Sequence, residues 1–156
     1  MKRLTGFAPP YSVYFVCTVL SYVATTVFHY LIVQYVSRRQ NAVIIVLSGT
    51  LTATVLVSWF RAVMTNPEPS DKENHSYYCF QVKIKRETRY CPDCKKMVFE
   101  LDHHCYFLNT CVGTKNYSAF LTVVIATAMQ MFLHITVCIR FLMGKNCLGH
   151  LEERYV

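Results

Sequence analysis

The sequence predicts an all-α integral membrane protein. It would have three transmembrane helices and a zinc-stabilised, loop-rich, cysteine-rich segment between the second and third helix. Hydrophobic residues make up 53% of the 156 residues, above the roughly 45–50% that soluble domains use. They gather in three uncharged runs, and the polar stretch after the second run holds four cysteines between Cys91 and Cys111.

The three uncharged runs are long enough to cross a bilayer as helices. Tyr11–Ser37 has 27 residues, Ala42–Phe60 has 19 and Ser118–Ile139 has 22, and a helix needs ~20 apolar residues to cross a hydrocarbon core of ~30 Å. The three runs lack the alternation of apolar and polar residues that is typical of membrane-spanning β-strands. The first run also exceeds the roughly 7–15 residues of a signal-peptide core, so we expect a retained span. Three core helices of a soluble protein would leave too little polar chain to cover them.

Six segments follow from these runs. They are a cytosolic N-terminus at 1–10, transmembrane helices at 11–37, 42–64 and 118–143, a cytosolic cysteine-rich segment at 65–117, and a C-terminal tail at 144–156. Pro67 ends the second span, because proline cannot continue a helix and restricts the residue before it. Residues 66–117 carry eight Lys/Arg against seven acids, which favours the cytoplasmic side. Arg38 and Arg39 then fall on the far side, against the same bias.

The net charge of +7 is interpreted as a sign of contact with the membrane surface and not of nucleic-acid binding, because the basic residues concentrate beside the spans. The stretch Tyr78–Tyr90 could hold a short strand pair, but its core is too polar to decide. The loop is too small for a substantial apolar core, and a metal ion would supply the missing organisation.

The cysteine-rich segment has the ligand types of a zinc site. Eight cysteines could mean disulfides, but four of them are interleaved with histidines on a side predicted to be reducing, which favours metal binding or catalysis. Cys17 and Cys138 lie in predicted spans and are interpreted as small apolar fillers, whereas Cys79 and Cys147 have no assigned role. Cys91 and Cys94 form a C-x2-C pair whose thiolates can converge on one ion.

The remaining two zinc ligands come from His103, His104, Cys105 and Cys111. Adjacent His103 and His104 are not expected to reach the same ion. One choice, zinc on Cys91, Cys94, His104 and Cys111, leaves an acid, a base and a nucleophile free. A base beside a thiol favours the reactive thiolate, and a carboxylate can fix the tautomer of that base. The alternative is that all these residues are structural ligands and surplus neighbours.

The stretch Asp102-His103-His104-Cys105, after a cysteine-rich run and between spans, resembles the DHHC protein S-acyltransferases (palmitoyltransferases). The likeness continues through Cys111-Val112-Gly113, Asn116-Tyr117 and Phe120, and upstream Asn66-Pro67-Glu68 is similar to the family's Asp-Pro-Gly. It is strong over Tyr90–Phe120.

The resemblance implies a role for each matching residue. Cys105 would take the acyl group from acyl-CoA, His103 would be its base, and Asp102 would orient that base. Members of the family bind two zinc ions, and the ligands of the second ion would be Cys91, Cys94, His104 and Cys111.

The departures from the family pattern fall mainly on the first zinc site. That site would need a histidine in place of Tyr90, a cysteine in place of Met97, and a C-x2-C pair near 77–82, where only Cys79 remains. We therefore expect one zinc ion and a free thiol at Cys79. Tyr106-Phe107 replaces Pro-Trp, Thr110 replaces Asn, and Phe107 could keep an apolar contact.

The 13 residues after the third span also do not supply the family's fourth span or its Thr-Thr-x-Glu motif. The acyl chain lies among the helices in this family, so a partner subunit or a second copy would be needed to close the cavity.

The resulting expectation is a multi-pass protein-cysteine S-palmitoyltransferase of endomembranes (ER or Golgi), in preference to the plasma membrane. It would move a fatty acyl group from acyl-CoA, through acyl-Cys105, to cysteine thiols of membrane-proximal client proteins. The alternative is a catalytically inactive zinc-binding adaptor of the same family. A zinc hydrolase is disfavoured, because four protein ligands leave no open position for water on the ion.

Overall fold

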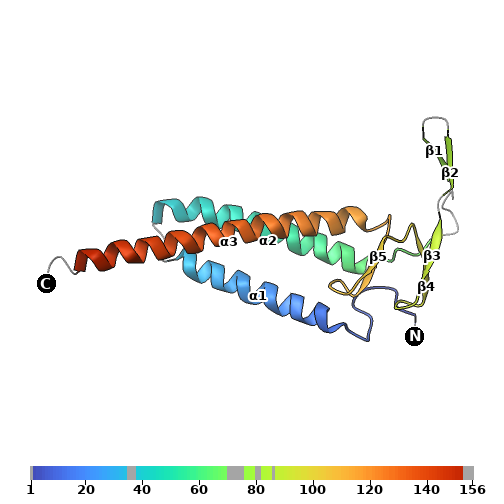
Figure 1. The fold of residues 1–156 in the computed structure, drawn as a ribbon, viewed down its shortest axis with the longest axis horizontal. Helices are drawn as coiled ribbons and strands as arrows, with labels where there is room; N and C mark the ends of the chain where they lie inside the picture. Colours follow the sequence, from blue (N-terminus) through green and yellow to red (C-terminus); the bar gives the residue numbers. More distant parts are fainter. Residues whose placement is uncertain (1, 35–37, 70–75, 80–81, 86, 153–156) are drawn as a thin grey trace.

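A computed structural model describes residues 2–34, 38–69, 76–79, 82–85 and 87–152. Three helices lie lengthwise side by side, and short β-hairpins extend from one end of the bundle (Figure 1). The helices are α1 (Val13–Val33), α2 (Arg38–Met64) and α3 (Tyr117–Glu152). The described part of the N-terminus lies at the hairpin end, whereas α3 runs to the opposite end (Figure 1).

Each helix contains a segment long and apolar enough to cross a membrane, namely Val13–Val33, Ala42–Met64 and Tyr117–Met143. Most side chains on these segments are exposed, as expected for helices that face lipid. The prediction of three apolar spanning helices is therefore confirmed, although residues 35–37 of the first predicted span lie outside the described residues. The helix α3 continues to Glu152, beyond the predicted end at 143.

The prediction of a loop-rich segment in an all-α protein needs correction, because the described part of the segment consists largely of three antiparallel β-hairpins. They are β1 (Ser76–Cys79) with β2 (Val82–Lys85), β3 (Thr88–Cys91) with β4 (Lys96–Phe99), and β5 (His103–Cys105) with β6 (Thr110–Val112). The strands are three or four residues long, too short for periodicity to reveal them. The chain is mostly helical but not all-α.

Two groups of polar contacts join the helices inside the apolar bundle. The hydroxyl of Tyr22 donates to Oε1 of Gln130 at 2.9 Å, and Nε2 of Gln130 donates to the Thr52 hydroxyl at 3.0 Å. Nearer the far end, His29 lies 2.7 Å from the Ser48 hydroxyl and stacks on His134 at a ring separation of 4.2 Å. Polar side chains in lipid pair with one another, so these contacts fix how the three helices meet.

The N-terminal segment 2–12 runs across the hairpins before α1 begins. The Arg3 amide donates to the Cys94 carbonyl and the Gly6 amide donates to the Val63 carbonyl, both at 2.9 Å. A Cβ at Gly6 would lie 2.1 Å from the Leu108 carbonyl oxygen, so only glycine allows this approach. Asn109 anchors the same segment by donating to the carbonyls of Gly6 and Ala8.

Candidate active site and metal centre

Four side chains with metal-ligating atoms converge where two hairpins meet. They are Cys91 at the end of β3, Cys94 in the β3–β4 turn, His104 in β5 and Cys111 in β6, and their ligand atoms all lie within 4.8 Å of one another. His104 and Cys111 are directly opposed in the antiparallel register, so their side chains emerge on the same face. The structure thus brings together the four residues that the sequence proposed as zinc ligands.

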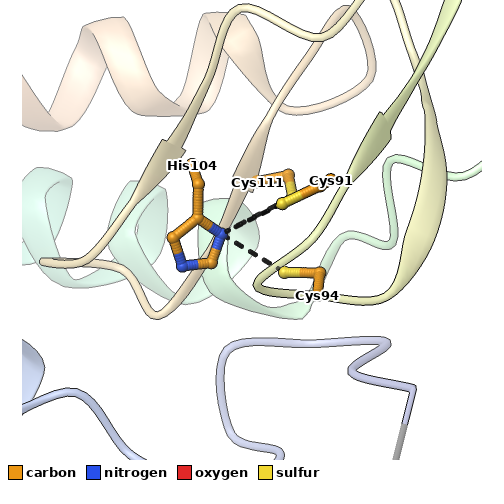
Figure 2. Close-up of side chains that lie close together, drawn as sticks. All are labelled: Cys91, Cys94, His104 and Cys111. Atoms are coloured by element: carbon orange, nitrogen blue, oxygen red, sulfur yellow. Dashed lines mark hydrogen bonds between the residues drawn. The ribbon is translucent and has the colours of Figure 1, made fainter.

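The spacing of these atoms fits a tetrahedral zinc ion. Nδ1 of His104 lies 3.6 Å from the Cys91 sulfur, 3.3 Å from the Cys94 sulfur and 3.7 Å from the Cys111 sulfur. Bond lengths of ~2.3 Å to sulfur and ~2.0 Å to nitrogen at tetrahedral angles give an N···S separation of about 3.5 Å. Figure 2 shows the ring with Nδ1 turned toward the sulfurs and its other nitrogen turned away.

The charge on these thiols also fits a cation between them. A hydrogen bond from the Cys111 thiol, followed by one from His104, lowers the pKa of Cys94, whereas the hydrogen bond to Cys94 and burial raise the pKa of Cys111. Crowded thiols cannot all ionise without a positive charge among them. A zinc ion would allow all three to bind as thiolates.

A buried lysine lies beside the same cluster. Lys96 is only 2% exposed, and its ammonium donates to the Leu4 carbonyl at 2.9 Å and to Oδ1 of Asn66 at 3.0 Å. Burial lowers the pKa of Lys96, and the negative charges of Cys94 and Cys111 oppose that shift. A buried ammonium needs a nearby negative charge, and a zinc ion held by the three cysteine thiolates would provide a net charge of minus one. Sequence reasoning missed this residue, since a lone lysine in a mixed-charge loop carries no signal.

The strand geometry of β5 separates His103 from His104. Successive side chains of a strand point to opposite faces, so His104 faces the cysteines while His103 and Cys105 share the other face. Nδ1 of His103 lies 3.1 Å from a carboxylate oxygen of Asp102, and both side chains are exposed. This contact leaves Nε2 of His103 on the far side of the ring, available to a substrate or a nucleophile.

Cys105 occupies an apolar setting at the hairpin end of the helices. Its side chain is 6% exposed and belongs to a cluster with Phe15, Val63 and Leu108, against which Phe120 packs. Burial raises the pKa of the Cys105 thiol, and hydrogen bonds from the backbone amides of Leu108 and Phe107 oppose the rise. These amides are a feature that the sequence did not reveal, because they depend on the turn after β5.

The structure links His103 and Cys105 through Phe120. The His103 ring packs edge-to-face on Phe120 at 5.3 Å, and Phe120 also contacts the cluster that contains Cys105. No hydrogen bond joins His103 to Cys105 in the described part of the chain. Catalytic contacts in substrate-free enzymes often tighten only when substrate binds.

Two of the positions where the family pattern is broken lie together on the β3–β4 hairpin. Tyr90 and Met97 are cross-strand partners, and both side chains are exposed. Phe107, at the substituted Pro-Trp position, packs edge-to-face on Tyr14 at 5.7 Å, which supplies the expected apolar contact.

The cysteines outside the cluster differ in their surroundings. Cys138 packs beside a buried apolar cluster of the helices, whereas Cys17 is exposed on α1 and is therefore not a filler of the interior. The side chains of Cys79 and Cys147 lie outside the described residues.

Two cavities adjoin the site. One of about 640 Å³ is lined by Asp102 together with Glu87, Arg89 and Glu100. The other, of about 130 Å³, is apolar and lies between the helices. Its lining includes Val19 and Trp59, which also pack against the cluster around Cys105.

Comparison with known proteins agrees with the resemblance drawn from the sequence. The profile of the DHHC palmitoyltransferase family matches residues 70–150. Probable protein S-acyltransferase 15 of Arabidopsis thaliana is 34% identical over 94 residues, which cover 59% of this chain and 34% of that protein.

Two further relatives are also named palmitoyltransferases. Palmitoyltransferase pfa3 of Aspergillus fumigatus is 39% identical over 64 residues, covering 40% of this chain and 12% of that protein. Putative ZDHHC-type palmitoyltransferase 7 of Dictyostelium discoideum is 31% identical over 78 residues, covering 49% and 18%. The matched part thus spans about a third or less of these relatives.

Proposed function

Because the chain belongs to the DHHC palmitoyltransferase family, we propose that it is a protein S-acyltransferase. It transfers a fatty acyl group from acyl-CoA to cysteine thiols of membrane-proximal client proteins on endomembranes, and palmitoyl is the first candidate for this group. The observation that carries this proposal is the arrangement around β5. One face holds an acid–base pair and a buried thiol, while the other face holds a complete set of metal ligands.

The proposed chemistry exchanges one thioester for another. Nε2 of His103 takes the Cys105 proton, the thiolate attacks the carbonyl carbon of acyl-CoA, and the bond to the CoA sulfur breaks. The CoA thiolate then receives the proton from His103. A client thiol repeats the sequence on acyl-Cys105, with His103 again as base and then acid. Asp102 keeps the His103 tautomer that presents Nε2. The exchange is nearly neutral in energy, so positioning and desolvation of the thiols provide most of the catalysis.

We assign the zinc ion a structural role. Cys91, Cys94, His104 and Cys111 would hold it, and it would fix the β3–β4 and β5–β6 hairpins against each other. Four protein ligands leave no position for a water or substrate. Cys105 stays outside the ligand set and keeps its thiol free for the reaction.

The apolar cavity between the helices is the proposed start of the acyl-chain site. It adjoins the Cys105 cluster through Val19 and Trp59, so a chain attached to Cys105 would reach it past these two side chains. Its volume of about 130 Å³ is below the roughly 300–1,000 Å³ of common ligand pockets. A long acyl chain must therefore part the helices or extend toward lipid, unless a partner subunit or second copy covers it.

Acyl-enzyme formation tests this function. The purified, zinc-loaded chain is incubated with an alkyne-tagged palmitoyl-CoA, and the label is located by mass spectrometry. We expect a hydroxylamine-sensitive label on Cys105 that Cys105→Ser abolishes while zinc content and membrane insertion stay unchanged. Cys138→Ser removes a half-buried thiol among the helices; it is the matched control and should label normally.

The second candidate is an inactive zinc-binding adaptor that holds client proteins. The broken family positions Tyr90 and Met97 favour it, because both side chains face solvent on one hairpin. Normal zinc content without any label on Cys105 would support the adaptor and rule out the acyltransferase.

A further inference from the structure

Cys105 lies at the end of a strand pair that is too short to hold it in place alone. The strands β5 and β6 have three residues each, and an isolated two-stranded hairpin is marginal in water. Within the connecting turn, the Leu108 amide donates to the Cys105 carbonyl at 3.2 Å, at the long end of the usual range for such a bond. The position of Cys105 therefore depends on what holds this turn from outside.

Asn109 ties this turn to the N-terminal segment 2–12. Its side-chain nitrogen donates to the Gly6 carbonyl at 2.7 Å and to the Ala8 carbonyl at 3.3 Å, and its Oδ1 accepts from the Ser12 amide at 3.2 Å. The residue is fully buried. Its φ of 55° is in the left-handed region, which asparagine tolerates better than most residues. Both the side chain and the backbone of Asn109 are thus suited to this position.

Gly6 brings the same segment into direct contact with the turn. A Cβ at Gly6 would lie 2.1 Å from the carbonyl oxygen of Leu108 and 2.8 Å from Cγ1 of Val63. The side chains of Leu108 and Val63 belong to the buried apolar cluster that contains Cys105. The Gly6 amide also donates to the Val63 carbonyl at 2.9 Å. The segment thus lies between the turn and the end of α2, where a methyl group has no room.

The turn also carries hydrogen-bond donors to the reactive sulfur. The backbone amides of Leu108 and Phe107 donate to the Cys105 side chain. A shift of the turn would therefore move the sulfur and these donors away from their present places. A misplacement of about 1 Å, even when it originates far from the reacting atoms, can slow an enzyme by about 10²-fold. The contacts that hold this turn are thus expected to control the rate of a reaction at Cys105.

We propose that Asn109 is a positioning residue for acyl transfer and that it acts through the N-terminal segment 2–12. The segment holds the turn after β5 in the place where the Cys105 thiol meets the carbonyl carbon of acyl-CoA. Asn109 has no chemical step of its own and acts only through the position of Cys105. This inference rests on the proposed acyl transfer by Cys105, and it adds the N-terminal segment to the parts of the chain that the reaction requires.

Gly6→Ala tests the contact between the segment and the turn. Gly6 does not have a positive φ, so alanine fits its backbone conformation and only the added methyl group acts. The purified, zinc-loaded full chain is incubated with alkyne-tagged palmitoyl-CoA, and we expect the variant to form the acyl-enzyme about 10²-fold more slowly than the wild type. Gly49→Ala is the matched control. A Cβ at Gly49 would lie 3.9 Å from the Tyr30 hydroxyl, so this variant should label at the wild-type rate.

Asn109→Gly tests the side chain of the positioning residue. It removes the hydrogen bonds to the segment, while glycine keeps the left-handed φ without strain. We expect acylation to slow by at least about tenfold. The double variant Gly6→Ala/Asn109→Gly should be no slower than the slower single variant, because both changes release the same turn and are therefore not additive. Losses that multiply in the double variant would show that Asn109 does not act through the segment.

The final extent of labelling distinguishes positioning from folding. A misplaced Cys105 in a folded chain should label slowly but reach the wild-type stoichiometry, with unchanged zinc content and an unchanged acyl-CoA concentration at half-maximal rate. If one variant loses zinc or final labelling, the other variant decides, and loss in both would overturn the proposal.

Wild-type rates in Gly6→Ala or in Asn109→Gly would overturn it as well. In that case the wild type still labels Cys105, so this inference fails alone. A wild type without any label contradicts the proposed function, and the inference fails with it.

Discussion

His103 and His104 are neighbours in the chain but face opposite sides of β5, so replacing one should impair a different property from replacing the other. We predict that His104→Ala loses the metal, because it removes one of four ligands. His103→Ala should keep the metal and slow acylation of Cys105 by about 10²–10⁴-fold, because the thiol loses its base. Metal analysis and the rate of acyl-enzyme formation are measured on both. Zinc loss in His103→Ala with retention in His104→Ala would reverse the assignment.

Lys96 gives a second prediction at the residue scale. Lys96→Met removes the charge beside the proposed zinc-binding thiolates while keeping an unbranched side chain that is one atom shorter. Without that charge the thiolates are more electron-rich, so iodoacetamide should alkylate them and release zinc faster than in the wild type. The unpaired Leu4 and Asn66 oxygens should cost about 1–3 kcal/mol of stability. Lys96→Arg, which keeps the charge, should be alkylated at close to the wild-type rate. Equal alkylation rates in the wild type and both variants would contradict a role of the Lys96 charge in protecting the thiolates.

At the scale of the elements, Gln130 joins all three helices in the apolar bundle through Tyr22 and Thr52. We predict that Gln130→Leu destabilises the bundle by only about 0.6 kcal/mol for each of the two hydrogen bonds it removes, because polar groups find other partners in the unfolded membrane state. Unfolding in mixed micelles measures this cost, and a double-mutant cycle with Tyr22→Phe isolates the shared bond. A loss above about 3 kcal/mol would mean that Gln130 has a further role.

At the scale of the whole molecule, the helices and the hairpins depend on different forces. The helices satisfy their backbones internally, whereas two-stranded hairpins are marginal alone and would draw their folding energy from the metal. We predict close to one zinc per chain. Chelation should expose residues 87–112 to protease while the helical circular dichroism persists, and added zinc should restore protection. Two equivalents of zinc, or helix loss on chelation, would contradict this division.

The sequence alone determined the features that local chemistry controls. Uncharged runs of sufficient length predicted the three membrane-spanning helices, because lipid imposes a length and an apolar surface on each. The Asp-His-His-Cys stretch with Cys91, Cys94 and Cys111 identified the family, which the profile match confirms. The four proposed metal ligands could be chosen because the spacing and the family pattern agree on them.

Tertiary structure decided which side chains meet. The strand alternation of β5 places His103 and His104 on opposite faces, and short hairpins give no periodic signal that would reveal this beforehand. Lys96 and Arg3 become buried only because the N-terminal segment 2–12 crosses the hairpins. This crossing places Leu4 against Lys96, which is 92 residues away in the sequence. Burial, and with it the demand for a counter-charge, arises from such long-range packing, which composition and spacing do not encode.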